Sequence, residues 1–203
     1  MSNNYSAISL SSLSSLADYE LVDTAVKGGE ASFEELVRRY QRPIAAYVYR
    51  MIGDYDAALD LTQDVFIKVY NSLARYRCEY KFSTWIYKIA HNAAIDHMRR
   101  YAVREQALAN SPDGDRRENS VESNRPTPEQ ESEKEERRSG IESVVRSLPA
   151  AYRELIVLRH SHDLSYDEIA EVTGLPLGTV KNRLFRARDA MRDQLLRRGI
   201  SGV

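Results

Sequence analysis

The chain has 203 residues, of which 42% are hydrophobic and 29% are charged, and its formal net charge is −1. This composition is typical of a soluble globular protein with one medium domain or two small ones, and the charge argues against a uniformly basic nucleic-acid-binding surface. The lack of a membrane-length apolar run, the absence of a signal-peptide pattern and the single Cys78 predict a cytoplasmic protein without disulfides.

Four segments differ in composition along the chain. Residues 1–17 are rich in serine and carry no charge, which predicts a flexible tail. Residues 18–104 show helical spacing of apolar side chains, and the same spacing returns over residues 140–198. Between them, residues 105–139 have three prolines and almost no large apolar side chains, so they cannot offset the entropy cost of ordering. The sequence therefore predicts an all-α protein, with two small helical domains joined by a flexible acidic and polar linker.

A helix predicted over residues 54–76 has two distinct faces. At about 100° per residue, one face is expected to meet the domain core, and it consists of Ala58, Leu61, Thr62, Val65 and Val69. The opposite face mixes apolar and acidic groups, namely Leu59, Asp60, Gln63, Phe66, Ile67 and Tyr70. This mixture is typical of a protein–protein interface, so we predict a protein partner here. The alternative is a helix buried on both sides within its own domain.

The next segment combines basic and aromatic side chains. Residues 75–81 are predicted to form a loop and residues 83–100 a helix, on whose outer face Lys88, His91, Asn92 and Arg99 are expected. Cations interleaved with aromatic rings suit single-stranded DNA, because bases stack on rings and phosphates meet cations. The rings concerned are Tyr76, Tyr80, Trp85 and Tyr87. The alternative makes them ordinary core residues, and for Trp85 we favour that alternative.

Residues 165–188 predict a helix-turn-helix. Ser165 and Glu168 have the spacing of a capping box at the start of a first helix, and Gly174 permits a tight turn after it. Pro176 suits the start of a second helix. On that second helix, Val180, Leu184 and Ala187 recur at helical spacing and are expected to pack against the first. The second helix of such a motif fits the major groove of DNA.

The second helix and its continuation are basic despite the near-neutral chain. From residue 181 to residue 198, seven lysines and arginines stand against two aspartates, which is the charge excess expected of a phosphate-facing helix. Arginine can read guanine and asparagine can read adenine, whereas other contacts reach only phosphate. The candidate DNA-contacting residues are Thr179, Lys181, Asn182, Arg183, Phe185, Arg186 and Arg188.

Three stretches of the sequence together resemble a known family. They are DLTQDVF (residues 60–66), KFSTWIYKIAHNAAIDHMRR (residues 81–100) and LPLGTVKNRLFRAR (residues 175–188). In this order and spacing they resemble the extracytoplasmic-function (ECF) sigma factors of RNA polymerase, over about residues 18–198. The resemblance implies that residues 18–104 dock on core RNA polymerase and read the minus-ten element. It also implies that residues 140–198 read the minus-thirty-five element of promoter DNA, and that an anti-sigma factor is a partner.

The resemblance also implies individual contacts. Asp60, Gln63, Asp64 and Phe66 would contact core polymerase, with Leu59 and Ile67 on the same face. The minus-ten element would be read by Arg75, Tyr76, Arg77, Tyr80, Lys81, Lys88, His91 and Asn92. The minus-thirty-five element would be read by Lys181, Asn182, Phe185 and Arg186, with Arg183 and Arg188 nearer the DNA backbone. The long acidic linker and the serine-rich leader depart from the family pattern.

Two other classes of protein, an enzyme and a self-sufficient regulator, agree less well with the sequence. An enzyme is not expected, because the sequence has no Gly-rich phosphate loop and no convincing nucleophile–base pair. His160, His162 and Asp163 lack the further ligands of a metal site, so we expect neither metal nor cofactor. The alternative function is a self-sufficient helix-turn-helix regulator that binds an operator without contacting polymerase. Such a regulator has no reason to carry the two-faced helix and the aromatic, basic loop together.

Overall fold

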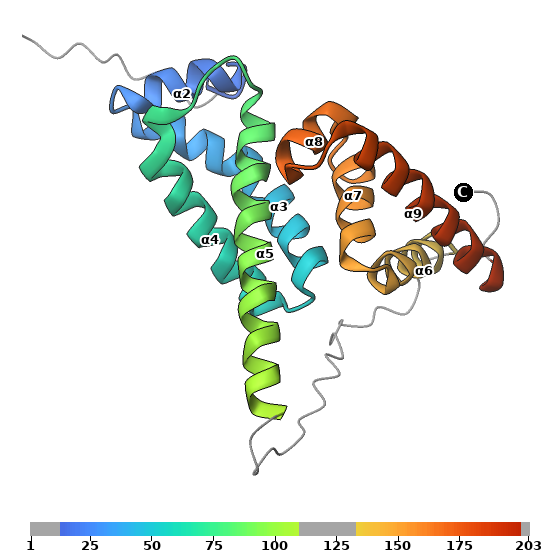
Figure 1. The fold of residues 1–203 in the computed structure, drawn as a ribbon. Helices are drawn as coiled ribbons and strands as arrows, with labels where there is room; N and C mark the ends of the chain where they lie inside the picture. The colour runs from blue at the N-terminus through green and yellow to red at the C-terminus, as the bar shows by residue number, and fades with distance from the viewer. Residues whose placement is uncertain (1–12, 110–132, 200–203) are drawn as a thin grey trace, which may run out of the picture.

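The computed structural model describes residues 13–109 and 133–199, and every regular element within these ranges is helical. The prediction of an all-α protein is therefore confirmed for the described residues. The first half contains α2 (Asp18–Val26), α3 (Glu30–Ile52), α4 (Tyr55–Ser72), the short 3-10 helix η1 (Leu73–Arg75) and α5 (Phe82–Ala109). The second half contains α6 (Glu133–Ser147), α7 (Ala150–His160), α8 (Tyr166–Thr173) and α9 (Leu177–Arg197). Figure 1 shows the two halves side by side, with α7 and α8 next to α3 and α5.

Local signals in the sequence set the ends of these helices. α3 ends at Gly53, whose φ of 82° is in the left-handed region that favours glycine, and Asp54 then caps α4 by accepting a hydrogen bond from the Ala57 amide. Ser165 and Glu168 form the predicted capping box of α8, and Gly174 ends that helix with a φ of 69°. The predicted turn between the two helices of the motif is thus present.

The capping box gives a first test of how local structure supports the fold. We expect Ser165→Ala to lower the free energy of unfolding by about 1 kcal/mol, because the Glu168 amide loses its side-chain acceptor. Urea unfolding followed by circular dichroism measures this difference. A loss of stability below a few tenths of a kcal/mol would mean that the cap contributes little here.

The N-terminal tail is shorter than the sequence indicates. Residues 1–12 lie outside the described residues, but Leu13 is buried and Leu16 packs against the core. Arg39 donates hydrogen bonds to the carbonyl oxygens of Leu13 and Ser14, at 3.1 and 3.0 Å, and forms an ion pair with Asp18 at 2.8 Å. The sequence did not predict this packing, because two leucines among serines give no clear helical period.

Both ends of the predicted linker are helical. α5 continues to Ala109, past the expected boundary at residue 104, and α6 begins at Glu133, before the expected boundary at residue 140. These extensions consist largely of Ala, Glu, Lys and Arg, which have high helix propensity even without an apolar face to pack. The middle of the predicted linker, residues 110–132, lies outside the described residues.

None of the helices within residues 13–109 and 133–199 is both long enough and apolar enough to cross a membrane. Over the same ranges, no cluster of three or more His, Cys, Asp or Glu side chains is arranged to hold a metal ion.

Candidate functional site

The two faces predicted for α4 are present, except that one residue predicted on the outer face, Phe66, is buried. Ala58, Leu61, Thr62, Val65 and Val69 are all buried, as predicted. Leu59 and Ile67 are exposed, at 39% and 58% of their surface, and Asp60, Gln63 and Asp64 are exposed beside them. Tyr70, at 60% exposed, extends the same surface. An exposed strip with apolar, amide and acidic groups therefore runs along α4, here called the α4 strip.

Phe66 does not belong to the α4 strip in this structure. Its side chain is only 9% exposed and is part of the hydrophobic core. Residues 58, 62 and 66 recur every four positions, so Phe66 shares the ridge of Ala58 and Thr62 rather than the outer face. The prediction that Phe66 lies on the outer face is therefore wrong, and its contact with core polymerase stays a prediction.

The basic and aromatic segment after α4 divides into an exposed loop and a largely covered helix. Arg75, Arg77, Tyr80 and Lys81 are exposed around the start of α5. The hydroxyl of Tyr76 donates a hydrogen bond to the Tyr80 carbonyl oxygen at 2.5 Å, which closes the loop on itself. This loop also carries the exposed Cys78.

The aromatic rings of this segment have different environments. Trp85 is half-buried and packs against Tyr76 and Phe82, with ring centroids 5.3 and 5.6 Å away, in agreement with the core assignment favoured for it. Tyr87 is only 3% exposed, so it is not available for base stacking in this structure. Tyr80 remains the exposed ring, at 54%.

The outer face of α5 meets the second half of the chain. Lys88 forms an ion pair with Glu171 of α8 at 2.6 Å, and Lys81 forms one with Glu168 at 2.9 Å. His91 is paired with Glu154 of α7, and its side chain is 13% exposed. Asn92 is exposed. The eight residues predicted to read the minus-ten element lie in or next to the loop before α5 and on the outer face of α5, but three of them, Lys81, Lys88 and His91, contact acidic side chains of the other half.

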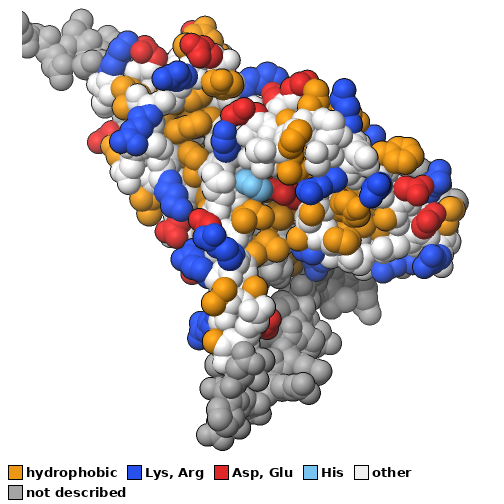
Figure 2. Space-filling view, viewed as in Figure 1, with side chains coloured by type: hydrophobic (Ala, Val, Ile, Leu, Met, Phe, Trp, Pro, Cys, Tyr) orange, Lys and Arg blue, Asp and Glu red, His pale blue; other side chains and the backbone are white. Residues whose placement is uncertain are grey.

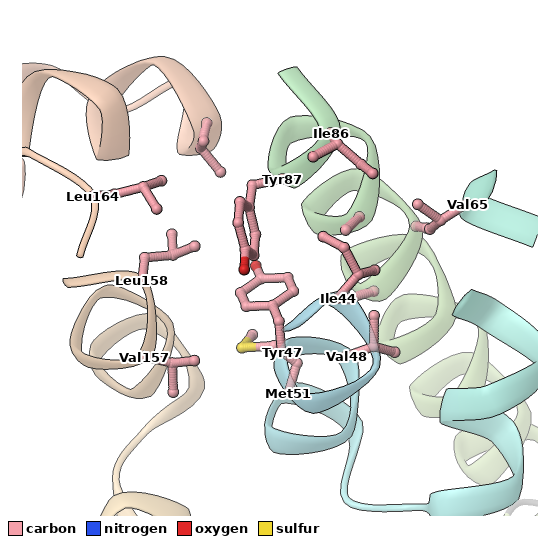
Figure 3. Close-up of a cluster of buried hydrophobic side chains, with 14 of the residues drawn as sticks. Ile44, Tyr47, Val48, Met51, Val65, Ile86, Tyr87, Val157, Leu158 and Leu164 are labelled. Atoms are coloured by element: carbon pink, nitrogen blue, oxygen red, sulfur yellow. The ribbon is translucent and has the colours of Figure 1, made fainter. Parts of the chain in front are cut away.

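A buried aromatic cluster lies behind these ion pairs. Figure 3 shows Tyr47 of α3 and Tyr87 of α5 directed toward Leu158 and Leu164 of the second half. The Tyr47 hydroxyl donates a hydrogen bond to the buried Glu154 carboxylate at 3.1 Å, and burial raises the pKa of both tyrosines. The Tyr87 hydroxyl lies 2.5 Å from Nδ1 of His162. The two halves are therefore joined by buried contacts as well as by surface ion pairs.

His162 makes the stability of this packing dependent on pH. Burial, together with the nearby positive charge of Arg50, lowers its pKa to about 4 from the ordinary 6.5, and Asp163 opposes this shift only in part. Between these values the unfolded chain binds more protons than the folded chain, so stability decreases as the pH falls from about 6.5 to about 4. We expect the loss attributable to this residue to reach about 2 kcal/mol between pH 7 and pH 5.

The measurement compares urea unfolding of the wild type and His162→Asn at both pH values. The variant, which cannot take up this proton, should lose less stability than the wild type by about that amount. Equal losses in the two proteins would mean that the His162 pKa is not lowered by the fold.

The second helix of the motif, α9, presents the predicted DNA-contacting residues. Val180, Leu184 and Ala187 are buried against the rest of the second half, as predicted. Lys181, Asn182, Phe185, Arg186 and Arg188 are exposed, and Phe185 reaches 73%. Thr179 and Arg183 are half-buried and, with Asn182 and Arg186, line an open hollow of about 410 Å³ near the start of the helix. Basic and acidic side chains are interspersed over the face shown in Figure 2, so this face is not uniformly basic.

Comparison with known proteins gives the family. Residues 36–104 match the profile of Sigma-70 region 2, and residues 139–191 match that of Sigma-70 region 4. The chain is 37% identical over 182 residues to the ECF RNA polymerase sigma-E factor of Escherichia coli K12, covering 87% of this chain and 93% of that protein. The chain belongs to the ECF RNA polymerase sigma factor family. As a sigma factor, it directs RNA polymerase to promoters and initiates transcription.

Other sigma factors share its sequence or its fold. SigW of Bacillus subtilis is 34% identical over 174 residues, covering 83% of this sigma factor and 91% of SigW. The sigma factor RpoE of Bartonella quintana, solved with the anti-sigma factor NepR, superposes with a TM-score of 0.65 at 24% identity, over 80% of this chain and 96% of that one. CnrH, solved with the cytosolic domain of CnrY, superposes with a TM-score of 0.62 at 24% identity, over 89% of this chain and 97% of that one. The last two likenesses concern the fold.

Proposed function

We propose that this sigma factor docks on core RNA polymerase through the α4 strip. The observation that carries the proposal is the exposure of Ile67, Leu59 and Tyr70 next to Asp60, Gln63 and Asp64 on one helix whose other face is fully buried. Exposed apolar groups within a polar rim are typical of an interface whose partner is absent. In this proposal residues 18–104 form the polymerase-docking and minus-ten domain.

The minus-ten element is assigned to the loop and the outer face of α5. Arg75, Arg77 and Lys81 offer cations to the phosphates of a separated strand, and Tyr80 offers an exposed ring to a base. Lys88, His91 and Asn92 continue this surface along α5, on the side where α7 and α8 now pack. Tyr76 supports the loop through its hydrogen bond to Tyr80.

Residues 140–198 are assigned to the minus-thirty-five element. α9 would enter the major groove with Lys181, Asn182, Phe185 and Arg186 toward the bases, and with Arg183 and Arg188 nearer the backbone. Thr179, at the start of the helix, lies in the same hollow as Asn182 and Arg183. The protein would act in the cytoplasm, where RNA polymerase transcribes, and an anti-sigma factor is proposed as a regulatory partner.

The test is co-purification followed by transcription. The tagged wild-type protein, freed of any bound partner, is mixed with purified core RNA polymerase, and the complex is used to select promoter fragments from fragmented genomic DNA. We expect stoichiometric capture of core enzyme and run-off transcripts from the selected fragments. Duplex DNA binding as a dimer without capture of core enzyme would instead favour a self-sufficient regulator.

A further inference from the structure

We infer that the free protein is closed on itself, with the acidic side chains of α7 and α8 occupying the place that promoter DNA takes on α5. This inference rests on the proposed minus-ten surface and concerns its regulation. It assigns to Glu154, Glu168 and Glu171 a role as internal competitors for the His91, Lys81 and Lys88 side chains of that surface.

Three acidic groups of the second half each contact a residue of the proposed minus-ten surface. Glu171 pairs with Lys88 at 2.6 Å, Glu168 pairs with Lys81 at 2.9 Å, and Glu154 pairs with His91. Thr84, one turn before Lys88, is only 4% exposed, and its hydroxyl lies 3.5 Å from Glu168. Carboxylates therefore stand where the phosphates of a DNA strand would have to be placed.

The three pairs between the halves differ in exposure to solvent. A buried pair holds the halves together more strongly than an exposed one, because solvent and salt screen it less. The side chains of Lys81 and Lys88 are 75% and 45% exposed, so their ion pairs are screened by solvent and salt. Glu154 is only 6% exposed and also accepts the hydrogen bond from the buried Tyr47. The contacts around Glu154, with the Tyr87–His162 contact, fix the closed arrangement, and the lysine pairs mainly neutralise the DNA-binding charges.

Further contacts join α7 to the end of α3. Arg153 donates hydrogen bonds to the carbonyl oxygens of Arg50 and Met51, at 3.3 and 3.2 Å. These carbonyls belong to the last turn of a helix, where a cationic side chain interacts favourably with the unpaired acceptors. Because both halves belong to one chain, such contacts form at high effective concentration even where each is weak.

Closure affects the two promoter-binding surfaces unequally. Most of the DNA-contacting residues assigned on α9 remain exposed, with Phe185 at 73%, and only Thr179 and Arg183 are half-buried. On α5, in contrast, His91 is 13% exposed and Lys88 is paired. The closed protein should therefore still bind duplex DNA through α9 while its affinity for a single strand is reduced.

The experiment opens the full-length protein without changing any residue assigned to DNA. The variant Glu154→Gln with Glu171→Gln removes two negative charges with little change of shape. Asp167→Asn removes a negative charge from the same helix as Glu171, at a carboxylate that takes part in none of the ion pairs above, and serves as the control. Glu154→Gln alone is a second opening variant, which weakens the buried contacts that fix the closed arrangement and leaves both lysine pairs intact. Circular dichroism checks that each variant is folded.

Two readouts are recorded for every protein. The separation of the halves is measured between spin labels on the natural Cys78 and on Asp193→Cys of α9. Because Cys78 lies in the minus-ten loop, affinity is measured on unlabelled protein carrying the natural Asp193, for a short single-stranded DNA of mixed sequence and for the matching duplex. We expect the opened variants to show a longer label distance and roughly tenfold tighter single-strand binding, with less than a twofold change for the duplex, while the control behaves as the wild type.

Either of two results would overturn the inference. An unchanged label distance in both opening variants would mean that these carboxylates do not hold the halves together. A longer distance without a gain in single-strand affinity would mean that closure does not compete with DNA. A separate variant tests the proposed minus-ten surface itself. Arg77 lies in the exposed loop and takes no part in the closed contacts, so Arg77→Ala is added to the opened variant. If single-strand affinity then stayed unchanged, the proposed minus-ten surface would be wrong.

Discussion

Replacement of Asp60 and Gln63 by alanine should lower the affinity for core RNA polymerase about 100-fold, which corresponds to roughly 2.7 kcal/mol. Both side chains are exposed at the centre of the α4 strip, between Leu59 and Ile67. Polar groups enclosed by apolar contacts lose water on binding and must find partners, so truncating them removes hydrogen bonds from a desolvated interface. The measurement is a titration of fluorescently labelled sigma factor with core enzyme.

The matched control is Asp23→Ala with Gln41→Ala. These residues are also exposed and lie on α2 and α3, so the same two chemical groups are removed from the same half without touching α4. Core affinity should stay within twofold of the wild type in this control. An equal loss in both double variants would indicate a general defect of the fold, and no loss in the α4 variant would remove the α4 strip from the docking surface.

The second large effect is expected at α9. Lys181→Ala with Arg186→Ala should lower the affinity of the polymerase holoenzyme for a selected promoter fragment about 100-fold, because each good base contact contributes roughly 1–3 kcal/mol to recognition. Core capture should be unchanged, because both residues are exposed on the half opposite the α4 strip. Holoenzyme binding to the promoter fragment and run-off transcription measure this loss.

Arg192→Ala with Arg197→Ala provides the control for charge. These residues lie on the same helix, and the change in net charge is the same, but both are in its C-terminal half. We expect this variant to lose promoter affinity by only a few-fold, through non-specific electrostatics. If it lost as much as the Lys181 and Arg186 variant, recognition would depend on total charge rather than on the start of α9.

Much of the fold follows from periodicity and capping. The buried stripe of α4, the capping box at Ser165 and the turn at Gly174 agree with the sequence because each depends on residues within one or two turns. The buried face of α9, formed by Val180, Leu184 and Ala187, agrees for the same reason. The exposed side chains of the α4 strip could also be predicted, because only the core face of that helix is continuously apolar.

The differences between the predictions and the structure arise where tertiary contacts decide whether a side chain is buried or paired. Tyr87 is buried because of the neighbours it meets, Tyr47 and His162, and local spacing alone does not mark its position. Phe66, by contrast, follows the four-residue spacing of Ala58 and Thr62. Glu154, Glu168 and Glu171 carry contacts between the halves, yet no sequence pattern marks any of them as an interdomain contact. A pairing such as Lys88–Glu171, 83 positions apart, has no periodic signal that a single sequence could reveal.

The end of α5 has a mechanical consequence. In Figure 1 this helix extends beyond the helices packed around it, and residues 101–107 are all exposed, including Tyr101 and Val103. A helical segment this short has little intrinsic stability without packing, so it can unwind at small cost in free energy. A residue contributes about 1.5 Å in a helix and up to about 3.3 Å when extended, so unwinding residues 101–109 would add roughly 16 Å to the span between the two halves. By unwinding at its tip, α5 would thus lengthen the connection between the two halves without altering the packed part of either half.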